Sequence, residues 1–324
     1  MAEARKPAAF VHLRVKSAYS LLEGAIRPKE LAELALKNAM PAVGITDVNN
    51  LFGVYEISEA LAAKGVQPIV GCLISVDLDE AATPTTGVMT RARPPYLPVL
   101  VQNEIGYRNL AKLLSAAYLG AEPGDWPHVK AAALASHAEG LIALTGGPGG
   151  PLNRLIVEGQ PDAASALLDR LKAMFGDRLY VELQRHGLPE ERAAEEQLID
   201  LAYAKDVPLV ATNDVHFGGA DMYEAHDALL CIADSTFVSQ QDRRRLTREH
   251  RFKSPAEMAA QFADLPEAIE NTIEIARRCA FLPKKRDPIL PKFVPESGLS
   301  TAEELQAQAE AGLARRLKEH GLFA

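Results

Sequence analysis

The side chains of greatest chemical interest are two histidines, one aspartate and two cations. His186 lies in the string QRHG, and Asp214 and His216 lie in NDVH. Three ligands of these types and a water molecule can make a catalytic zinc centre. Arg14 and Lys16, in FVHLRVKSAYSLLEGA, have the opposite chemistry. Neither a guanidinium nor a protonated lysine has a lone pair to give a metal.

Short apolar runs, rich in β-branched and aliphatic residues, predict the strands that must position these side chains. The runs are FVHLRV (10–15), AVGITD (42–47), PIVGCLISVD (68–77), YLPVLVQ (96–102), GLIALTG (140–146), LYVELQR (179–185) and PLVATND (208–214). Segments with apolar residues at three- and four-residue spacing predict helices, among them 28–39, 54–65, 107–119 and 189–206. This regular alternation predicts parallel strands joined by right-handed crossovers.

Composition limits the classes of function. The chain has 324 residues, 48% of them hydrophobic, which is enough for a substantial core. A net charge of −8 argues against a protein that coats nucleic acid. The start, MAEARKPAAF, has no signal-peptide core, and no run approaches the ~18 apolar residues of a membrane span, so we expect a cytoplasmic protein with no membrane partner. Three separated cysteines, Cys72, Cys231 and Cys279, fit a reducing compartment and buried positions.

Three segments depart from the strand–helix pattern. Residues 1–9 are expected to be disordered, and the Thr-, Pro- and Ala-rich residues 78–95 are expected to form a mobile loop. Prolines crowd residues 282–298 and mark a domain boundary. A final helix is predicted from Thr301 to His320, with Ser300 as its cap.

Long strings of the chain resemble the polymerase and histidinol phosphatase (PHP) domain, in the form that opens the alpha subunit of the bacterial replicative DNA polymerase III. The strings are FVHLRVKSAYSLLEGA, PAVGITDVNNLFGVYE, PIVG, YVELQRHGLPEE, PLVATNDVHF, EAHDALLCI and LPEAIENTIEIARRC. The resemblance implies a distorted seven-stranded (β/α) barrel over residues 10–283, with its site at the carboxyl ends of the strands. Residues 284–324 would be the linker and first helix leading into the polymerase palm region, so the chain is expected to be a fragment.

The resemblance also implies a metal site, and this chain lacks most of the ligands of that site. An HxH pair of the family is replaced by Arg14 and Lys16. The remaining positions fall on Asp47, Val48, Leu73, Leu97 or its neighbour, Gly147, His186, Asp214 and His216. A two-metal hydrolase needs ligands on several strands, including a bridging carboxylate where Leu73 now stands.

The two cations are therefore predicted to substitute for metal charge. A unit positive charge about 4 Å from a dication is repelled by several kcal/mol at an effective dielectric constant of about 20. The planar fork of Arg14 suits a two-bond pair with Asp214, which would be costly to bury alone. We predict no metal and no catalytic residue in this chain. One zinc held by His186, Asp214 and His216 is the alternative.

Other patterns receive simpler interpretations. Arg243, Arg244, Arg245 and Arg248 form a basic cluster that is either a solvated face or a local contact with DNA or another anion. GGPGG at 146–150 lacks the Lys-Ser/Thr of a P-loop and is interpreted as a tight turn. Asp77 and Asp79 are interpreted as solvated carboxylates rather than palm aspartates.

Three functions remain open. The first is a catalytically inactive PHP domain that serves as a structural platform in the replicase and docks a separate proofreading exonuclease subunit. The second is an active metal-dependent 3′–5′ exonuclease or phosphoesterase domain, and the third is a free-standing PHP phosphatase. The resemblance implies that the parent protein is a DNA-directed DNA polymerase, a nucleotidyltransferase that contacts DNA and uses Mg²⁺ outside this segment. We therefore expect no cofactor here, and we expect the rest of the alpha subunit as a further partner.

Overall fold

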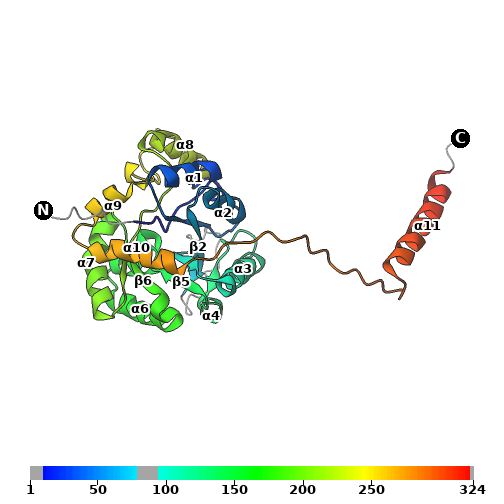
Figure 1. Cartoon of the computed structure of the whole chain (residues 1–324), viewed down its shortest axis with the longest axis horizontal. Helices are drawn as coiled ribbons and strands as arrows, with labels where there is room; N and C mark the ends of the chain where they lie inside the picture. The colour runs from blue at the N-terminus through cyan, green and yellow to red at the C-terminus, as the bar shows by residue number, and fades with distance from the viewer. Residues whose placement is uncertain (1–9, 79–93, 322–324) are drawn as a thin grey trace. The chain divides into compact units, whose positions relative to one another are not determined.

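A computed structural model describes residues 10–78 and 94–321 of the chain (Figure 1). The predicted disordered segment 1–9 and nearly all of the predicted loop 78–95, including Asp79, lie outside the described residues. The chain divides into two compact units, residues 1–283 and 284–324. Each unit is described by itself.

The first unit is built on a seven-stranded sheet. Its order is β1-β2-β3-β5-β6-β7, with β4 paired to β2. Each predicted run from residue 42 onward contains one strand, whereas β4 was not predicted. The strands are β1 (Ala42–Val48), β2 (Gln67–Asp77), β3 (Tyr96–Val101), β4 (Val129–Lys130), β5 (Leu141–Leu144), β6 (Leu179–Leu183) and β7 (Leu209–Ala211).

The prediction of an all-parallel sheet is wrong at β3. This strand runs antiparallel to both β2 and β5, whereas β1–β2, β5–β6 and β6–β7 are parallel. Residues 78–95 carry no helical pattern in their sequence that would serve as a crossover, and an antiparallel neighbour needs none. The first residue of β3, Tyr96, therefore lies beside the carboxyl ends of the other strands.

Residues 10–17 close the sheet into a barrel, but the strand predicted at their start is irregular. It makes isolated parallel bridges, at His12 to β1 and at Val15 to the segment after β7. The Gly44 N–H donates to the His12 carbonyl (2.6 Å) and the Thr46 N–H to the Val15 carbonyl (2.9 Å). A two-residue step on β1 thus spans three residues on its neighbour, which is the geometry of a β-bulge.

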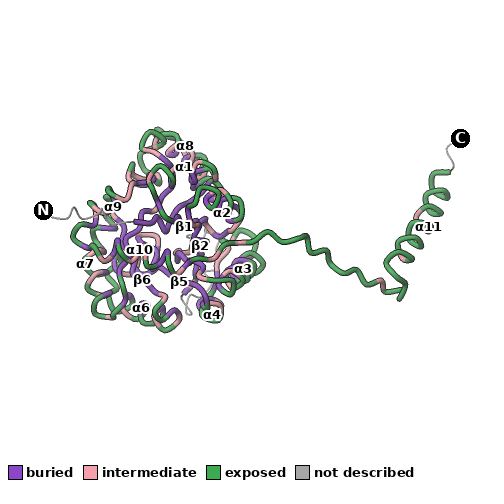
Figure 2. Tube along the Cα trace, in the orientation of Figure 1, coloured by how far each residue is buried: buried purple, intermediate pink, exposed green. Residues whose placement is uncertain are grey.

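Two layers of buried side chains hold this unit together. The strand–helix layer contains most of the core, and the labelled strands are largely purple in Figure 2. A second cluster, which includes Leu13, Ile142, Leu144, Tyr180 and Val210 from the strands, fills the barrel itself. Helix α10 (Pro266–Arg278) contributes Ile275, Ala276 and the adjoining Cys279 to this cluster. The Gln67 side chain at the start of β2 also donates to the Ala276 and Cys279 carbonyls, so α10 closes the amino-terminal end of the barrel.

The predicted helices are confirmed, and Figure 1 shows them around the outside of the sheet. All three cysteines are buried and free, as predicted. The α-helices are α1 (Pro28–Lys37), α2 (Val54–Ala62), α3 (Glu104–Leu119), α4 (Ala131–Ser136), α5 (Pro151–Val157), α6 (Pro161–Phe175), α7 (Pro189–Ala204), α8 (Tyr223–Ala233), α9 (Pro255–Gln261), α10 and α11 (Thr301–His320). Short 3₁₀ helices occur at η1 (Gly147–Gly149), η2 (Gly176–Arg178), η3 (Ala220–Met222) and η4 (Arg248–His250).

The second unit contains helix α11, whose predicted bounds are confirmed. Its Ser300 cap forms a capping box with Glu303, because each side chain bonds the backbone N–H of the other. None of its described residues is buried. Within the described part of the whole chain, no helix has the length and apolar character of a membrane span.

Candidate functional site

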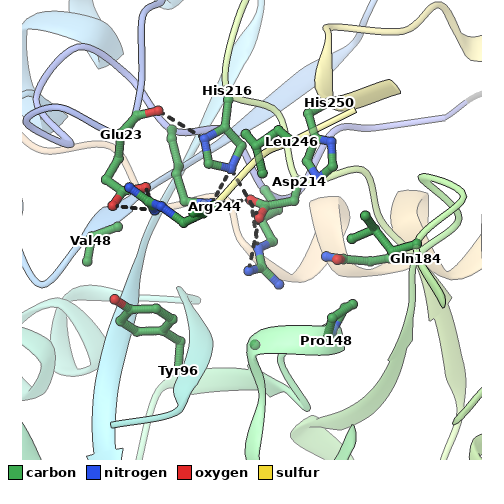
Figure 3. A pocket seen from close by; sticks show the side chains of 14 residues that line it. Glu23, Val48, Tyr96, Pro148, Gln184, Asp214, His216, Arg244, Leu246 and His250 are labelled. Carbon is green, nitrogen blue, oxygen red and sulfur yellow. Dashed lines mark hydrogen bonds and ion pairs between the residues drawn. The ribbon is translucent and has the colours of Figure 1, made fainter. Parts of the chain in front are cut away.

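A pocket of about 180 Å³ opens at the carboxyl ends of the parallel strands. Val48 ends β1, Gln184 follows β6 and Asp214 follows β7, and all three line it. Tyr96 joins them because β3 is reversed. In Figure 3, Tyr96 and Pro148 lie across the pocket from the polar groups of Arg244, His216 and Asp214. The site was predicted at the carboxyl ends of the strands, and the structure has a cavity at that position.

Arg14 is held in this pocket by two carboxylates. Its side chain is only 4% exposed. Nε donates to Asp214 Oδ1 (3.1 Å) and Nη2 to Oδ2 (3.4 Å), which confirms the predicted two-bond pair. Nη1 donates to both oxygens of Glu182 (3.2 and 3.3 Å) and to the Gly146 carbonyl (3.0 Å). Burial alone would raise the pKa of Asp214, but the charges of Arg14 and Lys16 outweigh it and hold that pKa well below its usual value.

Lys16 lies between Asp214 and His216. Its Nζ donates to Asp214 Oδ1 and is 2.9 Å from His216 Nε2. His216 Nδ1 lies 2.9 Å from the Glu23 carbonyl, which can only accept, so Nδ1 carries the ring proton. Burial and the charge of Lys16 lower the pKa of His216 and keep the ring neutral. The Nε2 lone pair, which a metal would need, accepts a hydrogen bond from Lys16 instead.

Asp47 is fully buried and bonded to two serines. Its carboxylate accepts from the Ser17 N–H (2.8 Å), the Ser17 hydroxyl (2.7 Å) and the Ser20 hydroxyl (2.6 Å). Burial raises the pKa of Asp47, and these hydrogen bonds oppose the rise. Asp47 is not among the residues that line the pocket. Its role in the structure is to hold the turn that begins at Ser17.

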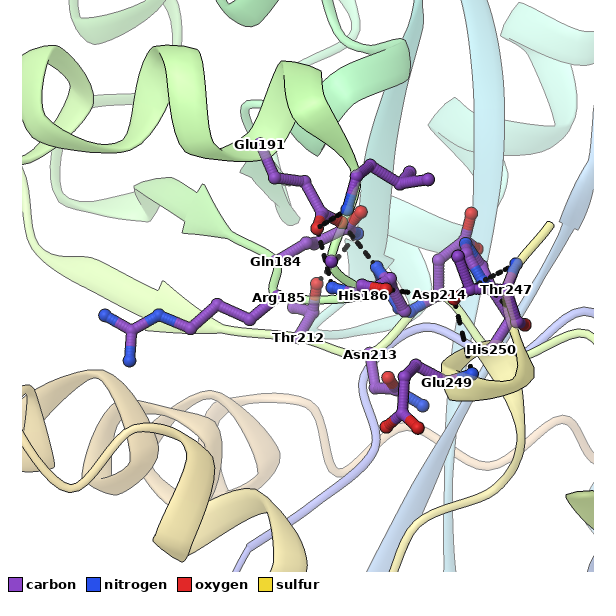
Figure 4. A network of polar contacts seen from close by, with 12 residues as sticks. Gln184, Arg185, His186, Glu191, Thr212, Asn213, Asp214, Thr247, Glu249 and His250 are labelled. Carbon is purple, nitrogen blue, oxygen red and sulfur yellow. Dashed lines mark hydrogen bonds and ion pairs between the residues drawn. The ribbon is translucent and has the colours of Figure 1, made fainter.

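His186 is also committed to structural contacts (Figure 4). The backbone N–H of Asp214 donates to His186 Nε2 (3.2 Å), so the other ring nitrogen carries the proton. That nitrogen, Nδ1, donates to Glu191 Oε1 at 2.6 Å. The ring stacks on His250 with centroids 3.9 Å apart. The predicted zinc set of His186, Asp214 and His216 therefore has both of its imidazole lone pairs in use.

The other predicted positions divide between pocket and core. Val48 lines the pocket, whereas Leu73 and Leu97 are fully buried in the sheet. The neighbour of Leu97, Tyr96, is the residue that reaches the pocket. Gly147 has a φ of 57° in the turn after β5, where a Cβ would lie 2.7 Å from the Gln184 side chain. The GGPGG stretch is thus a tight turn into α5, as predicted, and not a phosphate loop.

Sequence reasoning missed the second carboxylate of the site. Glu182 is 0% exposed and accepts hydrogen bonds from Arg14, the Gly146 N–H (2.9 Å) and the Gln184 side chain (3.0 Å), and also from the Thr212 hydroxyl. It lies inside LYVELQR, a run that was predicted only as a strand. The available signal was alternation, because Tyr180, Glu182 and Gln184 share one face of β6.

The residues present do not fit a metal centre. No group of three or more His, Cys, Asp or Glu side chains with the arrangement of a metal site exists among residues 10–78 and 94–321. Asp214 is bonded to two cations, and both candidate imidazoles use their lone pairs within the protein. A divalent ion would have to displace Lys16 and the Arg14 fork, each nearly buried.

The predicted basic cluster is largely neutralised by carboxylates. Arg243 makes a bidentate pair with Asp227, both distances being 2.6 Å. Arg244 donates to both oxygens of Glu23 (2.9 Å each) and also bonds Asp234. Arg248 bonds Glu224 at 3.4 Å, and Arg245 bonds only the Gln240 carbonyl within the described residues. Whether these arginines contact DNA remains a prediction.

The chain has recognisable relatives among known proteins. The PHP domain family matches residues 12–186. DNA polymerase III subunit alpha of Caulobacter vibrioides is 54% identical over 309 residues, which are 95% of this chain and 27% of that protein. The same subunit of Rickettsia bellii is 36% identical over 308 residues, 95% of this chain and 25% of that protein. An amidohydrolase structure from Chromobacterium violaceum has a TM-score of 0.42 and 16% identity, covering 68% of this chain and 97% of that one. The chain thus spans about a quarter of the length of these curated relatives.

Proposed function

The chain belongs to the PHP domain family, and from this premise we propose that it is the PHP domain of a replicative DNA polymerase III alpha subunit. In this role it would act in DNA replication as a non-catalytic platform. Identities of 54% and 36% over 95% of the chain support the assignment to that subunit. The parent would be a DNA-directed DNA polymerase in the bacterial cytoplasm, with its Mg²⁺-dependent nucleotidyl transfer carried by residues outside this segment.

The observation that supports the loss of catalysis is the ion pairing of Asp214. Metal-dependent phosphoester hydrolysis needs carboxylates and imidazoles with free lone pairs to fix ions that activate water. Here the Arg14 fork takes both oxygens of Asp214, and Lys16 takes one of them together with the His216 lone pair. The side chains that would position a metal and a nucleophile are therefore engaged in holding the barrel end together.

A platform of this kind requires proofreading to be supplied by another protein. We propose that a separate exonuclease subunit docks on this domain, because the domain itself lacks the groups for hydrolysis. The same reasoning makes the rest of the alpha subunit a second partner, and DNA a partner through the parent protein.

The test is a metal count and a nuclease assay on one preparation of the purified chain. We expect less than stoichiometric zinc, manganese, iron and magnesium by elemental analysis after desalting. We also expect no nucleotide release from a 3′-labelled single strand with added Mn²⁺, Mg²⁺ or Zn²⁺, with a known exonuclease as the positive control. Stoichiometric metal together with chelator-sensitive release would replace the platform with the active-exonuclease alternative.

A further inference from the structure

One buried amide on the wall of the pocket has an acceptor that the protein leaves free. Gln184 is 6% exposed and lines the pocket. Its Nε2 donates to the Glu182 carboxylate (3.0 Å) and to the Thr212 hydroxyl (3.1 Å), so the amide oxygen faces away from Glu182. No described residue donates to this Oε1. Buried polar atoms normally have a partner, so a free acceptor on a cavity wall indicates a place for a ligand.

His250 supplies a free donor on the same pocket, and it is only 3% exposed. The Thr247 N–H, which can only donate, bonds His250 Nδ1 (3.2 Å), so the ring proton lies on Nε2. The Thr247 carbonyl, 3.3 Å from the same Nδ1, accepts the backbone N–H of His250. Burial, with His186 and His216 nearby, lowers the pKa of His250 well below 6.5 and keeps the ring neutral. Within the described part of the chain, Nε2 has no hydrogen-bond partner.

Both free atoms can be reached from the pocket. Among residues 10–78 and 94–321, the fully enclosed side-chain polar atoms that lack a partner are His12 Nδ1, Ser58 Oγ and Asn153 Oδ1. Gln184 Oε1 and His250 Nε2 are not in that group, so each keeps contact with the cavity that its residue lines. The two side chains lie on the same side of the pocket in Figure 3.

The charges around the pocket cancel, which indicates an uncharged ligand. Three cationic side chains pair with three carboxylates: Arg14, Lys16 and Arg244 with Glu182, Asp214 and Glu23. None of these cations is therefore left to neutralise an anion. A charged ligand would add a charge without a partner in a poorly solvated site, which costs free energy.

The other wall and the size of the pocket favour a small planar group. Tyr96 and Pro148 lie across the pocket from the polar groups (Figure 3). An aromatic ring packs well against another flat ring. The volume of about 180 Å³ is below the roughly 300–1,000 Å³ of pockets for drug-sized ligands, so the ligand is small.

We propose that the pocket binds a small, uncharged, planar ligand that carries a carbonyl acceptor and an N–H donor, which is the chemistry of an amide. The ligand N–H would donate to Gln184 Oε1, and its carbonyl would accept from His250 Nε2. Arg14 Nη2 makes one hydrogen bond, to Asp214, and keeps a second N–H for the same carbonyl. Pyrimidine bases and aromatic carboxamides both have this chemistry. The inference goes beyond the platform function and does not depend on it.

The experiment titrates the full chain with uracil, nicotinamide and inorganic phosphate by calorimetry at neutral pH. We expect uracil or nicotinamide to bind with a Kd on the order of 1 mM or tighter. The fully N-methylated analogue of the ligand that binds should bind about tenfold or more weakly, because it has no N–H for the buried Gln184 acceptor.

The test variant is Gly149→Leu, which fills the pocket without removing any of its polar groups. A Cβ at Gly149 meets only a Tyr96 ring carbon at 3.8 Å, so a longer side chain can occupy the cavity beside that ring. The matched control is Gly312→Leu on α11, where a Cβ meets nothing within 4 Å. We expect Gly149→Leu to weaken Kd about tenfold or more and the control to stay within about twofold, with melting temperatures showing that both variants fold.

The outcomes identify the source of the amide or overturn the site. Binding of uracil alone would indicate a pyrimidine, and binding of nicotinamide alone would indicate a carboxamide; either result supports the proposal. A wild-type chain that binds neither compound would overturn it, as would tighter binding of phosphate than of both. Equal binding by Gly149→Leu would place the ligand outside this pocket, and equal binding of the methylated analogue would contradict the hydrogen bond to Gln184.

Discussion

Arg14 neutralises more buried charge than any other single side chain discussed for this site. It bonds the fully buried Glu182 and both oxygens of Asp214. Removing one member of a buried ion pair leaves an uncompensated charge, which is far costlier than replacing the whole group by apolar side chains. The arginine is therefore structural as well as incompatible with a metal.

We expect Arg14→Ala to lower the free energy of unfolding by about 3–5 kcal/mol, because Glu182 and Asp214 lose their shared partner. Denaturant titration followed by circular dichroism measures this change. The matched control is Arg108→Ala, which removes an exposed pair with Glu104 on α3 and should cost roughly 0–1 kcal/mol. An Arg14→Ala protein as stable as the control would show that the cation does not support the barrel.

For single residues, the sequence predicted which side chains form the site better than it predicted the groups that they bond. Arg14, Lys16, Asp214 and His216 were expected at one site, and the Arg14–Asp214 pair was expected as well. Glu182 was missed because alternation places it on the same face of β6 as Tyr180 and Gln184 but does not show whether that face points into the barrel or into solvent. Its partner is 168 positions away along the chain.

Among the elements, the bulged segment that closes the barrel depends on one glycine. A Cβ at Gly44 would lie 2.4 Å from the carbonyl oxygen of Leu13, so no larger residue fits while β1 and the bulge stay together. The same bulge sets the inward direction of Arg14 and Lys16. Packing at Gly44 is therefore coupled to the ion pairs that Arg14 and Lys16 make.

We expect Gly44→Ala to destabilise the first unit by about 1–3 kcal/mol or more, as overpacking against fixed backbone does. Thermal unfolding measures the loss. Gly149→Ala is the control, since a Cβ there meets only a Tyr96 ring carbon at 3.8 Å, an ordinary contact. Equal melting temperatures for the two variants would mean that the closing segment can move away from β1 without cost.

Periodicity predicted the helices and most strands because it reports which faces are buried. It could not predict the direction of β3, because an isolated apolar run has the same pattern in either direction. It also could not predict the bulge at Leu13, where the alternation of FVHLRV breaks without a local signal. Both features depend on which segments pair, and pairing is a property of the whole sheet.

For the whole molecule, buried neutral histidines make stability dependent on acid. Burial lowers the pKa of His226 from 6.5 to about 4, and it also lowers the pKa values of His216 and His250. In this range the unfolded chain binds protons that the folded chain does not, so stability falls as pH decreases from about 6.5 to about 4. As pH falls further through the usual carboxyl range, protonation of Asp214 in the unfolded chain adds a further loss, because its folded pKa is well below 3.8.

His226→Gln isolates one part of this acid response. The glutamine amide can donate to the Glu23 carbonyl, as His226 Nε2 does at 2.8 Å, but it does not titrate. Between pH 7 and pH 4.5 the wild type should lose roughly 2 kcal/mol more stability than this variant, by linkage from a shift of 6.5 to about 4. Urea unfolding at the two pH values measures the difference, with the exposed His320→Gln as control. Parallel losses in all three proteins would show that His226 does not contribute, and would assign the acid sensitivity to groups that every variant keeps, namely the other buried histidines and the carboxylates.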